Sequence, residues 1–290
     1  MGIVSQRDIA LTGIPRGGTT LACRLLGEGP DCVALFEPMP VLSLPLSRAL
    51  AVQDIALYFC DVRQRALEHG RVPSKHSDGV IPDNPFGARE ERSGVRPQQT
   101  DLGEIAVGKP LSPEFRLVIK HNAAFTSLLP ELAERFTVVG VLRNPLAVLA
   151  SWRSLDLPVS RGRLPAGERW DPVLATALDA QPDLLRRQIM LLEWFFARLQ
   201  SMVAPTRLVR YEDTVASHGE ALLHAAGRTP AAGAGVALRN RNVNAQYDAG
   251  EVTMLVEMLR EHAHACWSSY SVAEVETLAA RMTTGDRGDD

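Results

Sequence analysis

The stretch Ile9–Leu26, with the sequence IALTGIPRGGTTLACRLL, decides the fold. It begins with an apolar run typical of a buried strand, turns at Gly17 and Gly18, and continues from Thr19 and Thr20 with a helical pattern. Backbone N–H groups at such a turn form a concave anion site, and the helix N-terminus adds positive partial charge. The stretch therefore predicts a strand, a phosphate-binding loop and a helix; the alternative is a plain strand–helix turn with a surface arginine.

This loop resembles the P-loop of nucleoside triphosphate enzymes but departs from it at one position. Gly13 and Gly18 have the separation of the two P-loop glycines, whereas Thr19 stands where that motif has its lysine. The positive charge stands instead at Arg16, before the paired glycines. The departure counts against an ordinary ATPase or kinase.

Four more short apolar runs follow along the chain, each bounded by turn residues. They are Cys32–Leu35, Leu117–Ile119, Thr137–Leu142 and Arg207–Val209. Helix-period stretches follow several of these runs, and the longest, Leu184–Met202, is apolar on nearly every face and is expected in the core. This alternation predicts an α/β fold in three layers, with a parallel sheet covered by helices.

The chain of 290 residues is long enough to bury one large core, and we expect a single domain over residues 1–290. The stretch Pro73–Pro113 differs from the rest because it is rich in Pro, Gly, Asp, Arg and Gln and has almost no apolar periodicity. It is longer than an ordinary connection in a compact domain. Two interpretations stay open: a lid-like excursion that faces the substrate, or a disordered surface loop.

The composition of the chain indicates which partners and which cellular location to expect. A formal net charge of -3 gives no reason to expect a nucleic acid as partner. The sequence has no signal-peptide pattern at its start and no apolar run long enough for a membrane span, so we expect a cytoplasmic protein. Its 4 cysteines lack metal-ligand spacing, and no metal site is expected. Abundant Ala, Arg, Leu and Gly suggest a bacterial chain.

A second phosphate site is indicated after the run Thr137–Leu142. Arg143 follows this strand at its carboxyl end, where open α/β sheets place their ligands. Asn144 is a plausible N-cap and Pro145 suits the first helical position, so a helix should start here. Ser151 lies about two turns further along that helix. Arg143 and Ser151 are candidates to hold one phosphate; the alternative is an arginine at a helix end and a serine in a packed interface.

Together the two segments resemble the signatures of sulfotransferases that use 3'-phosphoadenosine-5'-phosphosulfate (PAPS). Pro15, Arg16, Gly17, Gly18, Thr19 and Thr20 resemble the family's 5'-phosphosulfate loop, and Arg143 with Ser151 resembles its 3'-phosphate motif. The match covers about a third of the chain directly. Arginine at position 16, where cytosolic members usually carry lysine, resembles the carbohydrate and tyrosyl-protein branch.

The resemblance implies further nucleotide contacts. Tyr211, which follows a predicted strand, corresponds to a tyrosine near the nucleotide and is a candidate for adenine contact. Arg239 and Arg241 fall where some members place a basic loop over the 3'-phosphate, although the glycine-rich form of that loop is missing here.

The resemblance also suggests the catalytic groups. Glu37, in a Phe-Glu-Pro segment after the second predicted strand, matches the presumed base of carbohydrate-type members, and we favour it. His121 resembles, with a one-residue departure, the segment that carries the base in cytosolic members. Lys120 is the expected partner of the sulfo group or of the leaving oxygen, and Arg16 can reach the 5'-phosphate and that oxygen. The alternative for Glu37 is a surface carboxylate before a turn-forming proline. The alternative for His121 is a core histidine, or one that supports the reacting groups without touching them.

The expected activity is the transfer of a sulfo group from PAPS to a hydroxyl, or an amine, of a small-molecule or carbohydrate acceptor. The second product is 3',5'-bisphosphorylated adenosine (PAP), and no metal is required. One alternative is a module that binds PAPS or PAP without turnover. Another is a kinase-like phosphotransferase, which needs a P-loop lysine and a Mg²⁺-holding carboxylate.

Overall fold

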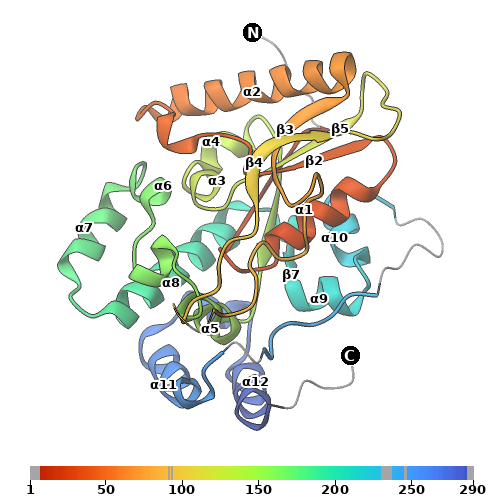
Figure 1. Cartoon of the computed structure of the whole chain (residues 1–290). Helices are drawn as coiled ribbons and strands as arrows, with labels where there is room; N and C mark the ends of the chain where they lie inside the picture. The colour runs from red at the N-terminus through yellow and green to blue at the C-terminus, as the bar shows by residue number, and fades with distance from the viewer. Residues whose placement is uncertain (1–6, 91, 93, 230–236, 245–246, 286–290) are drawn as a thin grey trace.

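The computed structural model describes residues 7–90, 92, 94–229, 237–244 and 247–285 (Figure 1). In these residues the central sheet has five parallel strands in the order β2-β5-β1-β6-β7. They are β1 (Ile9–Gly13), β2 (Cys32–Phe36), β5 (Arg116–Lys120), β6 (Thr137–Leu142) and β7 (Leu208–Arg210). All five runs predicted as strands lie in this sheet. The α/β class and the parallel sheet are thereby confirmed.

Helices cover both faces of the sheet (Figure 1). On one face, α1 (Thr19–Glu28) packs against β2 and β5, and α10 (Glu220–Ala225) packs against β7 and α1. The other face carries α2 (Arg48–His69), α3 (Ala123–Ser127), α4 (Leu129–Ala133) and α8 (Leu184–Met202). Because both faces are covered, the strands are continuous apolar runs; β1 and β2 are buried along their whole length.

The remaining helices surround this core. They are α5 (Pro145–Arg153), α6 (Pro165–Glu168), α7 (Pro172–Ala180), α9 (Tyr211–Ala216), α11 (Val252–His262) and α12 (Val272–Thr284), with 3₁₀ turns η1 (Val41–Ser43), η2 (Pro158–Arg161), η3 (Pro205–Arg207), η4 (Ala249–Glu251) and η5 (Ala265–Ser268). The core helix α8 has the bounds that its apolar pattern predicts. It packs into the core along one face, which includes Leu192, Phe195 and Phe196, whereas Leu184 and Met202 at its two ends are exposed. No helix in the described ranges is long and apolar enough to cross a membrane.

The excursion Pro73–Pro113 contains regular structure that its composition did not predict. A two-stranded antiparallel pair, β3 (Arg71–His76) and β4 (Asp101–Ala106), frames it. Proline is tolerated at position 73 because β3 pairs with β4 alone in the described structure, and an edge strand can spare one N–H. Between β3 and β4 the chain lacks helices and strands within its described part, as the composition suggested.

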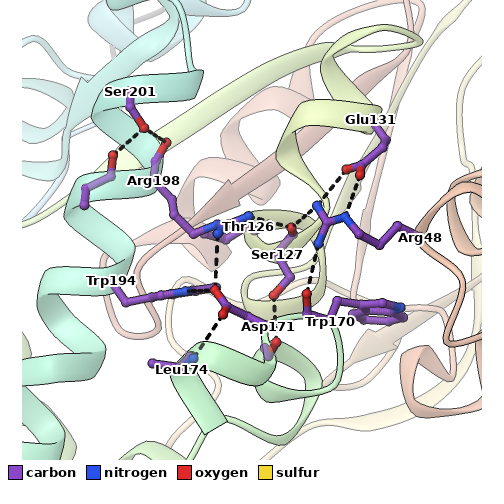
Figure 2. Close-up of polar contacts among 12 residues, drawn as sticks. Arg48, Thr126, Ser127, Glu131, Trp170, Asp171, Leu174, Trp194, Arg198 and Ser201 are labelled. Carbon is purple, nitrogen blue, oxygen red and sulfur yellow. Dashed lines mark hydrogen bonds and ion pairs between the residues drawn. The ribbon is translucent and has the colours of Figure 1, made fainter. Parts of the chain in front are cut away.

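A polar network connects five helices, α2, α3, α4, α7 and α8 (Figure 2). Arg48, at the start of α2, forms a bidentate ion pair with Glu131 of α4 and donates to the carbonyls of Ser127 and Trp170. Asp171 caps α7 and accepts from Trp194 and Arg198 of α8. Arg198 also donates to the carbonyls of Thr126 and Ser127, the last two residues of α3. The network fixes these helices relative to one another at points where backbone carbonyls lack helical partners.

Candidate active site

A cavity of about 280 Å³ lies at the carboxyl ends of the parallel strands. The segments that follow β1, β2, β5 and β6 contribute Arg16, Glu37, Asn122 and Arg143 to its wall. The excursion from β3 to β4, residues within 237–244, and Tyr247 line it from the other sides. Open α/β sheets bind ligands at this edge, because loops from neighbouring strands converge there.

The turn between β1 and α1 is built on close backbone packing. Gly18 has φ 88° and is the N-cap of α1, and a Cβ atom at this position would lie 2.5 Å from Cδ2 of Tyr211. Gly13 has φ 155°, and a Cβ there would lie 2.4 Å from the carbonyl oxygen of Val141. Only glycine fits both positions. The turn thus presses the N-terminus of α1 against the tyrosine that follows β7.

Arg16 projects from this turn and is fixed by three contacts. Its Nε donates to Oγ of Ser151 (3.2 Å), its Nη2 donates to Oδ1 of Asn84 (2.7 Å), and its guanidinium lies 4.7 Å from the centre of the Phe86 ring. Its backbone has φ 69°, an unusual conformation for a residue other than glycine. Burial, together with the nearby guanidinium of Arg143, lowers the pKa of Arg16 to about 9. A dense positive field surrounds this side chain.

Arg143 connects three loops at the edge of the sheet. Its guanidinium donates to the carbonyls of Arg16 (2.8 Å) and Arg241 (2.7 Å) and to Oδ1 of Asn242 (2.8 Å). It lies 4.6 Å from the centre of the Tyr211 ring and is only 4% exposed. The predicted N-cap at Asn144 and the helix start at Pro145 are confirmed, since Oδ1 of Asn144 accepts from the backbone N–H of Leu146.

Glu37 lies between two lysines. Its Oε1 accepts from Nζ of Lys120 (2.7 Å) and its Oε2 accepts from Nζ of Lys75 (2.8 Å). Burial by itself raises the pKa of Glu37, but the charges of Lys120 and Lys75 outweigh it and hold the pKa well below its ordinary value. In this arrangement Glu37 is an ionised carboxylate on the wall of the cavity.

His121 differs from Glu37 in its surroundings. It is 5% exposed, it packs beside Phe125, and its Nε2 accepts from the backbone N–H of Met39 (3.3 Å). Burial lowers the pKa of His121 to about 3, so the imidazole is neutral. The lone pair that a general base needs on Nε2 is engaged by the backbone, and the residue is outside the cavity lining.

The structure brings most of the predicted site residues to one cavity. The lining includes Pro15, Arg16, Gly18, Thr19, Thr20, Glu37, Lys120, Arg143, Tyr211, Arg239 and Arg241. Three predicted residues are outside it: Gly17, whose N–H bonds to Ile14 within the turn, His121, and the fully buried Ser151, which contacts Arg16 instead. Ser151 therefore acts on the cavity through Arg16.

Sequence reasoning missed several lining residues, among them Lys75, Asn84, Phe86, Arg96 and Tyr247. The first four belong to the excursion Pro73–Pro113, where no sequence motif indicated that they face the cavity. One signal was present for Lys75. The chain has only three lysines among its 31 lysines and arginines, and another of the three, Lys120, was already a candidate.

The cavity is strongly positive although the chain is not. Seven of its lining side chains are cationic and two are carboxylates, one of which, Asp83, pairs with Arg24. The cations are Arg16, Lys75, Arg96, Lys120, Arg143, Arg239 and Arg241. Since the formal net charge is -3, this concentration is local. The wall is suited to a ligand with several negative charges.

Comparison with known proteins assigns no relative to the chain. No family model matches it, and no curated protein sequence matches it. The function is therefore inferred from the residues of the cavity and from the sequence motifs that supply them.

Proposed function

We propose that this chain is a PAPS-dependent sulfotransferase that transfers a sulfo group to a hydroxyl, or an amine, of a small-molecule or carbohydrate acceptor. The observation that carries the proposal is the convergence of seven cationic side chains on one cavity at the carboxyl edge of the sheet. Two of them, Arg16 and Arg143, stand in the two segments that resemble the family's phosphate motifs. We take the turn before α1 as a P-loop-like phosphate-binding loop.

The residues present fit such a donor. PAPS carries roughly four negative charges, about two on the phosphosulfate and two on the 3'-phosphate. Arg16, Lys120 and the first turn of α1 would hold the 5'-phosphosulfate. Arg143, with Arg239 and Arg241 beside it, would hold the 3'-phosphate, and Tyr211 would border the adenosine.

When bound, the donor supplies a sulfo group on an activated oxygen, and transfer breaks the bond from sulfur to the bridging oxygen. Arg16 and Lys120 would stabilise the electron pair left on the 5'-phosphate oxygen. Glu37 would accept the proton of the acceptor hydroxyl as its oxygen bonds to sulfur. Each of these three groups is on the wall of the same cavity.

Calorimetric titration tests the nucleotide. We expect PAP to bind and ATP with Mg²⁺ to bind much more weakly, because the positive charge is arranged without a P-loop lysine. Preference for ATP with Mg²⁺ would support the kinase-like alternative and contradict the proposal. A second measurement is turnover in excess EDTA, where we expect undiminished activity. A loss of activity that Mg²⁺ restores would also support the kinase-like alternative.

A binding module without turnover is the second candidate, and one observation favours it. Both oxygens of Glu37 are bonded to lysines, which makes the carboxylate a weak base in this arrangement. Release of PAP from PAPS in large excess over the enzyme, measured with a panel of hydroxyl and amine acceptors and with water alone, separates the two candidates. Stoichiometric binding with no release under any of these conditions would support the module.

A further inference from the structure

Two of the three lysines in the chain bind the same carboxylate. Lys120 is at the end of β5 in the central sheet, whereas Lys75 is in β3 of the excursion. Nζ of Lys120 is 2.7 Å from Oε1 of Glu37 and Nζ of Lys75 is 2.8 Å from Oε2. The two ammonium groups thus approach the carboxylate from separate structural units.

The position of Lys75 is fixed by the residue before it. Ser74 is fully buried, and its Oγ accepts from the backbone N–H of Phe36 (3.0 Å), at the end of β2. This bond ties β3 to the strand end from which Glu37 follows. Lys75 also lies near the Phe36 ring, 5.8 Å from its centre. Its approach to Glu37 is therefore built into the fold.

The two lysines differ in what else they can do. The side chain of Lys120 is 3% exposed and that of Lys75 is 29% exposed. In the proposed function Lys120 turns toward the sulfo group and the leaving oxygen, which removes one positive neighbour from Glu37. A half-buried carboxylate that lost both ammonium neighbours would be protonated more readily and would cease to be a base.

We infer that Lys75 is a positioning residue of the reaction centre, which keeps Glu37 ionised and oriented while Lys120 binds the donor. The inference rests on the proposed function and deepens it. It assigns the excursion a part in the reaction and explains why one carboxylate has two cationic partners.

Four titratable groups face Glu37 from the elements packed around it. They are Lys120, Lys75, His121 and, from α1, Cys23. Burial lowers the pKa of His121 to about 3 and raises the pKa of the Cys23 thiol to about 12, so both are neutral near pH 7. The charge around Glu37 at working pH is therefore set by the two lysines.

The first test needs neither donor nor acceptor. Protein labelled with ¹³C at the glutamate carboxyl carbons is titrated with acid and followed by NMR, and the Glu37 signal is assigned from its loss in Glu37→Gln. Removing a cation destabilises the ionised carboxylate, so Lys75→Met should move the titration of Glu37 to higher pH. Lys75→Arg keeps the charge and should restore the wild-type behaviour, while Lys109→Met, which removes the lysine outside the cavity, should leave it unchanged.

The second test uses turnover with water in place of the acceptor. The bond from sulfur to the bridging oxygen breaks with its electron pair left on the 5'-phosphate, the water oxygen bonds to sulfur, and one water proton passes to Glu37. We expect Lys75→Met to shift the acid limb of the rate profile to higher pH, so that the fold-loss of rate relative to the wild type grows as the pH falls from 8.5 toward 4.5. Lys75→Arg should keep the wild-type limb.

Each outcome decides the inference. An unchanged Glu37 titration in Lys75→Met, or a loss of rate equal at every pH, would make Lys75 a purely structural residue. Thermal unfolding of each variant shows whether the fold is retained, and Lys75→Gln, which also removes the charge, carries the test if the methionine variant unfolds. A wild-type protein that fails to bind PAP in calorimetry contradicts the proposed function itself, which distinguishes that failure from failure of the role of Lys75 alone.

Discussion

Arg143 combines structural bonds with a place on the cavity wall, so its removal has two separable effects. We expect Arg143→Ala to weaken binding of PAP by about 1.5–3 kcal/mol, the range for a lost charge-assisted hydrogen bond. Binding of adenosine 5'-monophosphate, which lacks the 3'-phosphate, should change little. Calorimetric titration with both nucleotides measures the difference.

Two companion variants control this experiment. Arg153→Ala removes an arginine at the end of α5, the helix that follows Arg143; this arginine pairs with Glu251, and its loss should leave both affinities unchanged. Ser151→Ala should have a smaller effect than Arg143→Ala, because Ser151 acts by holding Arg16. Equal losses for the two nucleotides in Arg143→Ala would show that the arginine supports the loops rather than the 3'-phosphate.

Glu37 and His121 are separated by a pair of near-isosteric substitutions. Glu37→Gln should lower turnover by about 10²–10⁴-fold and leave PAP affinity nearly intact, because the carboxylate acts on the acceptor proton. His121→Asn should retain most of the rate, since Nε2 of His121 already accepts from the backbone of Met39. Rates of PAP release from PAPS, with calorimetry for affinity, provide the comparison.

The opposite pattern, a normal rate in Glu37→Gln and a large loss in His121→Asn, would make the histidine the base. If both variants are impaired, the pH dependence of kcat divides the roles. A group that only orients the acceptor leaves the acid limb in place, whereas loss of the base removes it.

At the scale of elements, the turn between β1 and α1 depends on Gly18. We expect Gly18→Ala to lower the free energy of unfolding by about 2–4 kcal/mol, because it adds backbone strain and a contact of 2.5 Å with the Tyr211 ring. The shift of Tyr211 should also weaken PAP binding. Urea denaturation and calorimetry measure the two effects.

Gly70 provides the matched control for this element. It has a similar left-handed backbone, φ 61°, at the end of α2, and a Cβ there would meet nothing within 4 Å. Gly70→Ala should therefore lose about 1–2 kcal/mol through backbone strain alone and keep full nucleotide affinity. A Gly18 variant no less stable than the Gly70 variant would refute the packing argument.

At the scale of the whole molecule, the network of Figure 2 holds the helices of one face together. Asp171 accepts from the backbone of Leu174 (3.0 Å), from Nε1 of Trp194 (2.7 Å) and from Arg198 (3.3 Å). We expect Asp171→Ala to lower the free energy of unfolding by about 2–3 kcal/mol, because it removes a helix cap and leaves buried donors unpaired. Urea denaturation measures the loss.

Asp183 is the corresponding cap of α8 and is exposed; among the described residues its side chain accepts only from the backbone N–H of Arg186 (2.7 Å). Asp183→Ala should lose about 1 kcal/mol, the value of a cap alone. The difference between the two losses of unfolding free energy measures what the contacts of Asp171 with α8 contribute to stability. Equal losses would mean that the contacts with α8 add nothing to stability.

The sequence by itself determined the sheet and the two motif segments. Five apolar runs marked the strands because strands buried on both faces leave no room for polar alternation. The positions of Gly18, Asn144 and Pro145 marked two helix starts through local backbone chemistry, and both helices begin as predicted. These features depend on neighbours within a few residues.

Only the tertiary structure decided which side chains meet. Lys75 reaches Glu37 because a buried bond from Phe36 to Ser74 joins segments 38 residues apart. His121 and Ser151, each chosen from a local motif, are outside the cavity because packing turns them toward Met39 and Arg16. The strands β3 and β4 form by pairing with each other across the excursion, so neither carries a strong local pattern. Such contacts join residues that are far apart in the sequence, so the local pattern around each residue does not predict them.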